Sequence, residues 1–289
     1  MESQYLLIFK YILHVWIIAV LINCNNANRE PIQNSSIKEL DNDEEVESGE
    51  YIIISPENPY FFKIQFQSDI QQYFHLWFPE LVIFEADSSR ATVPVISIRN
   101  WFIKTSDGFR VNGRIDDSID FHYFVKPVNR NMIKLELAVK NTGSHPFPCY
   151  AQLAVCLAPL SQTFSDTIGD RTFINVKESE LKAVNEVAVF DNFNHYPVRP
   201  KTDLSDSVQR IQVSSGYVSR SNKDKNMFIA FFWDSVARVD VNPGGLDCIH
   251  SHPAIGPLNP GATIKRTGYI LLKEGSASEG LKMSQDLFE

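Results

Sequence analysis

Short segments with alternating large apolar and polar residues are the feature that most constrains the fold of this chain. In residues 134–140 (KLELAVK) a large apolar side chain occupies every second position, as expected of a strand with one buried face. Similar segments, rich in β-branched and aromatic residues, recur between turn residues. The pattern predicts an all-β fold, a large two-sheet β-sandwich. The predicted strands are 51–55, 61–67, 73–78, 81–86, 92–103, 109–115, 119–128, 132–142, 150–159, 208–218, 227–234 and 263–274.

Residues 160–210 interrupt this rhythm with a long polar segment. It contains the helix that the sequence predicts, VKESELKAVNEV at 176–187. A long insertion in a compact sheet protein is often functional. We therefore expect part of the functional site here, with Arg171 and His195 as candidate residues.

The N-terminal segment predicts export. Residues 6–22 are largely apolar, and the run 11–22, apolar except for His14, has the length of a signal-peptide core. We expect residues 1–27 to be a signal peptide or a signal anchor. The protein is then secreted or extracytoplasmic, or else it is anchored to the membrane by residues 6–22. Asn34, in Asn-Ser-Ser, is a glycosylation acceptor in a eukaryotic host.

The negative charge is concentrated near the N-terminus. The chain has a net charge of −8, and residues 1–50 hold three basic and nine acidic residues, a net of −6. We expect 28–50 to be a disordered acidic linker, 51–276 to be the sandwich domain and 277–289 to be a C-terminal tail. The domain itself has no basic stripe, which argues against nucleic acid as a partner.

The cysteines leave two alternatives open. Cys149 and Cys156 are expected on one strand, where seven residues of separation keep them too far apart for a disulfide. Cys248 then either pairs with one of them, or all three are buried free thiols.

The stretch GGLDCIHSHPAIGPLNPG, residues 244–261, contains two histidines one residue apart, His250 and His252. Residues i and i+2 of a strand share a face, so both rings point the same way, as in many metal sites. In the alternative reading, the histidines are hydrogen-bonding groups that hold a structured connection. Asn259-Pro260-Gly261 predicts a type II turn into the last strand.

The segment FFWDSVARVDVNPGG, residues 231–245, suits contact with sugar. Trp233 is a candidate platform for a sugar ring, and Asp234 and Arg238 are candidate partners of sugar hydroxyls. The alternative is that Trp233 belongs to the core.

Residues 227–276 resemble the C-terminal part of a group of uncharacterised secreted bacterial proteins. In that group a strand ending near a Trp precedes a Cys-x-His-x-x-Pro loop, a Pro-Gly turn and a strand ending near Glu-Gly. The segment 139–148 (VKNTGSHPFP) is similar to galactose-mutarotase-like and polysaccharide-lyase-like sandwiches. The resemblance implies a large galactose-mutarotase-like supersandwich with a carbohydrate connection, and no established reaction. The matching residues are Trp233, Cys248, His250, Pro253, Pro260, Gly261, Glu274 and Gly275.

Three functional hypotheses remain. In the first, the protein is an exported module that binds or processes carbohydrate. In the second, it is a metal-dependent enzyme with His250 and His252 as ligands of a divalent metal, and no other cofactor is expected. In the third, it is a non-catalytic structural or adhesion module. For the first hypothesis, the candidate catalytic residues are His250, His195 and Asp247, and the candidate binding residues are Trp233, Asp234, Arg238, His252 and Arg171.

Overall fold

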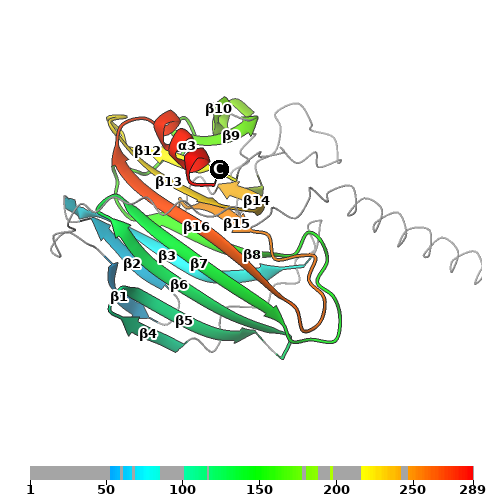
Figure 1. Cartoon of the computed structure of the whole chain (residues 1–289). Helices are drawn as coiled ribbons and strands as arrows, with labels where there is room; N and C mark the ends of the chain where they lie inside the picture. The colour runs from blue at the N-terminus through cyan, green and yellow to red at the C-terminus, as the bar shows by residue number, and fades with distance from the viewer. Residues whose placement is uncertain are drawn as a thin grey trace, which may run out of the picture. The chain divides into compact units, whose positions relative to one another are not determined.

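The computed structural model describes residues 53–58, 61–66, 69–84, 101–115, 117–177, 180–187, 196–197, 216–241 and 247–288. These residues form two antiparallel sheets that pack face to face (Figure 1). The predicted all-β fold with a two-sheet sandwich is therefore confirmed. Within the described ranges, no helix is both long enough and apolar enough to cross a membrane.

The first sheet joins seven described strands in the order β1-β2-β3-β8-β15-β14-β11. At its centre β8 pairs with both β3 and β15, so segments far apart in the sequence become neighbours. The strands are β1 (Ile53–Asn58), β2 (Phe61–Phe66), β3 (Asp69–Ile83), β8 (Gln152–Pro159), β15 (Ile249–Pro253), β14 (Val236–Val241) and β11 (Tyr196–Pro197).

The second sheet joins nine described strands in the order β10-β9-β12-β13-β16-β7-β6-β5-β4. Figure 1 shows β16 beside β7, and β6, β5 and β4 follow in that order on the other side of β7. The strands are β10 (Glu180–Ala183), β9 (Thr172–Lys177), β12 (Val218–Ser221), β13 (Met227–Trp233), β16 (Thr263–Glu274), β7 (Met132–Asn141), β6 (Ile119–Asn129), β5 (Gly108–Ile115) and β4 (Trp101–Thr105).

The core lies between the inner faces of the two sheets. On β7, Leu135, Leu137 and Val139 are at most 2% exposed and pack in this core, as the alternation predicts. On β8 every residue is buried, which fits its central place in the first sheet. Burial of these apolar side chains is the main stabilising contribution to the fold.

The helix predicted at 176–187 is wrong. Residues 176–177 end β9, residues 180–183 form β10, and the helix α2 covers only Val184–Val187. β10 forms an antiparallel hairpin with β9, which in turn pairs with β12. The hydrogen bonds gained by this pairing override the helical propensity of the Lys- and Glu-rich segment.

In the segment 277–289, which was expected to be a C-terminal tail, residues 277–286 form helix α3 (Ala277–Asp286) on the nine-stranded sheet (Figure 1). Ser276 and Glu279 form a capping box at its start. Leu281 is 3% exposed and packs in an apolar cluster on the outer face of the sheet with Tyr217 and Phe228. α3 thus belongs to the folded body.

Candidate functional site

A row of five side chains crosses the outer face of the seven-stranded sheet. Phe61 pairs with Trp77, Trp77 with Cys156, Cys156 with His250 and His250 with Asp240. Directly paired residues point to the same face, and the neighbours of these residues along each strand face the core. Strands β2, β3, β8, β15 and β14 therefore each contribute one chemically distinctive side chain to one surface.

Cys156, Cys248 and His250 form a buried cluster within this row. Their donor atoms all lie within 4.8 Å of one another, and the three residues are at most 2% exposed. Cys248 Sγ is 3.6 Å from His250 Nε2. Glu80 Oε2 lies 3.4 Å from the same nitrogen. Two thiols and one imidazole therefore converge on a small volume, and one carboxylate lies beside the imidazole.

Neither Cys156 nor Cys248 forms a disulfide, so the alternative in which Cys248 pairs with one of the other two cysteines is wrong. Cys149 is disulfide-bonded, so the alternative of three free thiols is wrong as well. The hydrogen bond from Cys156, together with the positive charge of His250, lowers the pKa of Cys248 to about 4 against the effect of burial. Burial raises the pKa of Cys156. One thiolate beside one thiol is the favoured state of the pair.

Glu80 reaches His250 because the β3–β8 ladder is irregular there. The register shifts between Trp77 and Leu81, so the strict alternation of faces along β3 breaks. Such a bulge re-aims side chains and is frequent next to functional sites. Burial lowers the pKa of His250, but the charges of Cys248 and Glu80 outweigh it and raise the pKa well above the ordinary value.

His252 lies on the same face as His250, with ring centroids 5.4 Å apart, but its surroundings are different. Its Nε2 lies 3.6 Å from Asp240 Oδ2, and neither ring nitrogen has a hydrogen-bond partner in the described part of the chain. Burial lowers the pKa of His252 to about 3, so the ring is neutral at neutral pH. It is absent from the cluster formed by the two thiols and His250.

Arg238 and Asp240 form an ion pair beside His252. Arg238 Nε donates to Asp240 Oδ1 over 2.6 Å, and Arg238 Nη2 donates to Asp240 Oδ2. The register of β14 on β15 places Arg238 opposite His252. Of the predicted binding residues, Arg238 and His252 therefore lie together on the face that carries His250.

Asp247 holds the backbone in place just before Cys248. Arg220 Nη1 donates to Asp247 Oδ1 over 2.9 Å and to its carbonyl oxygen over 2.6 Å. The backbone N–H of Asp166 donates to Asp247 Oδ2. Asp247 has a φ of 50°, in the left-handed region that these bonds must stabilise. Both carboxylate oxygens of Asp247 thus accept structural hydrogen bonds. This position indicates a structural role for Asp247 and not the catalytic role that was predicted.

Trp233 is not a sugar platform. It is 1% exposed and packs in the core between the sheets, near Phe78 and Phe231. Asp234 follows at the rim, where its Oδ2 accepts a hydrogen bond from the backbone N–H of Thr267. The core alternative is therefore correct for Trp233, and Asp234 holds the strand end.

The aromatic surface lies instead on β2 and β3. Phe61, Tyr73, His75 and Trp77 are all half-buried, and they point away from the core. Phe61 is 4.2 Å from His75 and 5.0 Å from Trp77, measured between ring centroids. Trp77 Nε1 is a buried donor without a hydrogen-bond partner among the described residues. The platform thus adjoins the thiol–histidine cluster through the Trp77–Cys156 pair.

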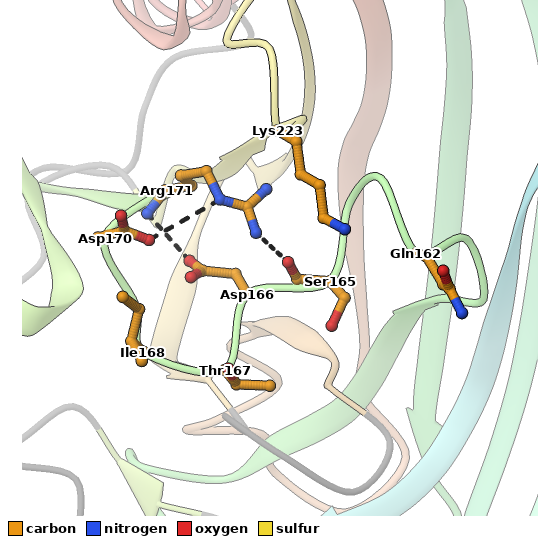
Figure 2. A pocket seen from close by; sticks show the side chains of 8 residues that line it. All are labelled: Gln162, Ser165, Asp166, Thr167, Ile168, Asp170, Arg171 and Lys223. Carbon is orange, nitrogen blue, oxygen red and sulfur yellow. Dashed lines mark hydrogen bonds and ion pairs between the residues drawn. The ribbon is translucent and has the colours of Figure 1, made fainter.

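Arg171 lines a separate polar depression of about 540 Å³ in the 160–171 segment, which Figure 2 shows. Its guanidinium donates to the carbonyl oxygens of Thr163, Ser165 and Ser221. Because three backbone carbonyls hold its guanidinium, Arg171 has a structural role and not the sugar-binding role that was predicted. The depression is lined by Gln162, Ser165, Asp166, Thr167, Ile168, Asp170, Arg171 and Lys223.

His195 and Asn34 lie outside the described residues. The predicted proximity of His195 to the histidines of β15 therefore stays a prediction, as does glycosylation at Asn34. Glu80, Trp77 and Arg220 also belong to the site, and the sequence alone did not indicate them. Their contacts depend on strand pairings across large separations in the sequence.

No protein-family model and no curated protein matches this chain. Several solved structures match it, among them sugar-related enzymes of the galactose-mutarotase-like and polysaccharide lyase kinds. A galactose mutarotase related enzyme from Lactobacillus acidophilus is 13% identical, with 78% of this chain and 98% of that chain covered, at a TM-score of 0.40. A putative aldose 1-epimerase from Escherichia coli is 10% identical, with 61% and 69% covered, at 0.35. A heparan sulfate lyase from Pedobacter heparinus is 9% identical, with 78% and 37% covered, at 0.39. At this level of similarity the matches do not indicate what the chain does.

Proposed function

We propose that this protein is an exported carbohydrate-binding β-sandwich whose binding surface is the outer face of the seven-stranded sheet. The observation that carries the proposal is the aromatic surface of Phe61, Tyr73, His75 and Trp77 beside the polar groups of β14 and β15. The C–H faces of sugar rings pack on aromatic rings, while charged and hydrogen-bonding groups orient the hydroxyls.

The polar groups nearest the aromatic surface suit hydroxyl recognition. Trp77 Nε1 and both ring nitrogens of His252 are buried without a hydrogen-bond partner in the described part of the chain. Buried polar groups are normally satisfied, so unsatisfied ones on one face favour a ligand that supplies the missing partners. The Arg238–Asp240 pair adds a guanidinium donor whose orientation the carboxylate fixes.

The test is a glycan-array screen of the full-length protein, followed by calorimetric titration with the oligosaccharide that binds. Trp77→Ala removes stacking and a donor, and we expect affinity to fall by about tenfold or more. Phe124→Ala is the matched control, since Phe124 is a half-buried aromatic residue on the other sheet, where it packs against Arg110.

Each outcome of this screen is informative. Binding that Trp77→Ala weakens and Phe124→Ala leaves intact supports the proposal. Binding that both variants retain places the site elsewhere, and no binding to any glycan class overturns the proposal. Chromatography of the incubated glycan separates binding from processing, because only an enzyme releases products.

Export is tested separately. Expression of the full chain with a C-terminal tag, followed by N-terminal sequencing, is expected to yield a mature protein in the medium that begins near residue 28. A cell-associated protein that retains residues 6–22 supports the membrane anchor instead. An intact chain in the cytosol overturns export. A mass decrease on deglycosylation, absent in Asn34→Gln, identifies the glycosylation site.

A further inference from the structure

We propose that Cys156, Cys248 and His250 bind one zinc ion, with Glu80 as the fourth ligand. The donor atoms of Cys156, Cys248 and His250 lie within 4.8 Å of one another. Glu80 Oε2 lies 3.4 Å from His250 Nε2. Thiolate sulfur, imidazole nitrogen and carboxylate oxygen are the ligands that zinc takes in proteins. This ligand set replaces the pair of histidines that the sequence pattern favours.

The distances match the edges of a zinc tetrahedron. With Zn–S near 2.3 Å and Zn–N or Zn–O near 2.0–2.1 Å, the edges are about 3.6 Å for S···N and about 3.3 Å for N···O. The structure has 3.6 Å between Cys248 Sγ and His250 Nε2, and 3.4 Å between His250 Nε2 and Glu80 Oε2. These two edges fit zinc coordination, and a rotation of the Glu80 side chain, which lies outside the 4.8 Å group of the other three donors, would complete the tetrahedron.

A catalytic Cys–His–Glu triad explains the geometry less well. In such a triad the acid contacts one ring nitrogen and the nucleophile the other, so that the imidazole relays between them. Here Glu80 and Cys248 both lie against Nε2 of His250. Nε2 carries at most one proton, which cannot serve Cys248 Sγ and Glu80 Oε2 at the same time. A single cation placed among the nitrogen, the sulfur and the oxygen can contact all three.

A disulfide between the two cysteines is also disfavoured by the register. Cys156 lies directly opposite His250, so Cys248 is its diagonal neighbour. Diagonal Cα atoms in an antiparallel pair are about 7–8 Å apart, beyond the reach of a disulfide without backbone movement. A metal ion, in contrast, bridges sulfur atoms about 3.8 Å apart, the S···S edge of a zinc tetrahedron.

The surroundings favour one ligand that exchanges more easily than the others. Cys156, Cys248 and His250 are buried, whereas the Glu80 side chain is 21% exposed. Zinc sites with three fixed protein ligands and one exchangeable position are the catalytic kind, while four fixed ligands make a structural site. The inference does not depend on carbohydrate binding, although the Glu80 side of the site adjoins Trp77 on β3.

The experiment measures zinc by plasma mass spectrometry in full-length protein purified without chelators and then equilibrated with zinc. We expect about one zinc per chain in the wild type, as in four-coordinate protein sites. Cys248→Ser and His250→Gln are expected to lose zinc affinity by more than the about 10–100-fold that outer-shell partners cost. Glu80→Gln is expected to weaken binding less, because water can replace the carboxylate.

His252→Gln is the matched control, since His252 is buried on the same strand and face but lies outside the cluster. It is expected to keep its zinc. Zinc lost equally in His250→Gln and His252→Gln would support the paired histidines and overturn the proposed ligand set. Absence of zinc from the equilibrated wild type, or a Cys156–Cys248 disulfide found by thiol counting, overturns the proposal itself.

Cobalt substitution keeps the proposal testable if the cysteine variants do not fold. The wild-type protein loaded with cobalt is expected to show the intense visible bands of tetrahedral coordination and thiolate-to-metal charge transfer in the near ultraviolet. Weak octahedral bands without charge transfer would exclude a site built on two thiolates. This readout needs neither a substrate nor an assay of activity.

Discussion

Arg220 Nη1 donates a hydrogen bond of 2.9 Å to Asp247 Oδ1, although the two residues lie 27 positions apart. Arg220 is fully buried, and its Nε donates to Thr172 Oγ1. Thr172 in turn donates to Asp166, whose backbone N–H donates to Asp247. This closed network fixes the residue that precedes Cys248, so it positions the thiol–histidine cluster.

We predict that Arg220→Met destabilises the protein by about 3–5 kcal/mol, because it leaves the Asp247 carboxylate buried without its charge partner. Urea unfolding followed by fluorescence measures the change. Arg114→Met is the control, since the Arg114–Asp120 pair is largely exposed and such pairs contribute little to stability. Equal losses in both variants would contradict a special role for the buried network.

Gly280→Ala is predicted to destabilise α3, although Gly to Ala normally stabilises a helix by about 1 kcal/mol. A Cβ at Gly280 would lie 2.4 Å from both Phe228 Cε2 and Tyr217 Oη, which are held in the packed cluster below the helix. Overpacking of this kind costs about 1–3 kcal/mol. Thermal unfolding of Gly280→Ala should give a lower midpoint than the wild type, whereas Ser278→Ala, at an exposed position of the same helix, should change it little. An increase for Gly280→Ala would mean that α3 packs less closely than described.

Asp166 should make stability depend on pH in acid. Burial raises the pKa of this carboxyl, but the Thr172 hydrogen bond, the Arg220 charge and the backbone N–H of Arg171 outweigh it, so the net shift is downward from 3.8. A carboxyl whose pKa is lower in the folded than in the unfolded state stabilises the fold fully at pH values above the unfolded-state pKa. This stabilisation is lost as the pH falls from the unfolded-state pKa through the folded-state pKa. We predict that Asp166→Asn costs about 1–3 kcal/mol at neutral pH. Urea titrations of both proteins should show this difference shrinking below about pH 4, and a difference that is constant with pH would refute it.

Trp233 in the core and Trp77 on the outer face of the seven-stranded sheet should respond differently to truncation. Trp233→Ala opens a cavity in the core and is expected to cost about 3–5 kcal/mol. Trp77→Ala is expected to cost clearly less, because Trp77 is half-buried on the outer face. Denaturant midpoints of the two variants check the order. Similar losses would indicate that Trp77 contributes to folding as much as the core does.

Much of the fold could be predicted from local sequence. The alternation in 134–140 gives the strand β7, and Asn259-Pro260-Gly261 forms the predicted turn, with Gly261 at a φ of 77° and a bond from Ala262 to Asn259. Both signals depend on residues adjacent in the chain. The hairpin β9–β10 was missed because its pairing, not its local propensity, decides its conformation.

The site was predictable only in part, for the same reason. His250, His252 and Arg238 come from neighbouring strands in one stretch of sequence, so the motif located them together. Glu80 and Cys156 come from strands whose order in the sheet no local pattern reveals. Trp233 was ambiguous because β13 is apolar at almost every position, which leaves no alternation to assign its face.

The row from Phe61 to Asp240 also has a consequence for the order of events in the cell. Its members come from five strands, and the chain between the first and the last spans most of the domain. Pairings of such large sequence separation form late, after the cost in loop entropy has been met. A chain emerging from the ribosome therefore has no site until β15 is made and docked on β8. Capture of a ligand or metal by this face would therefore mark a chain that has been made and folded at least as far as β15.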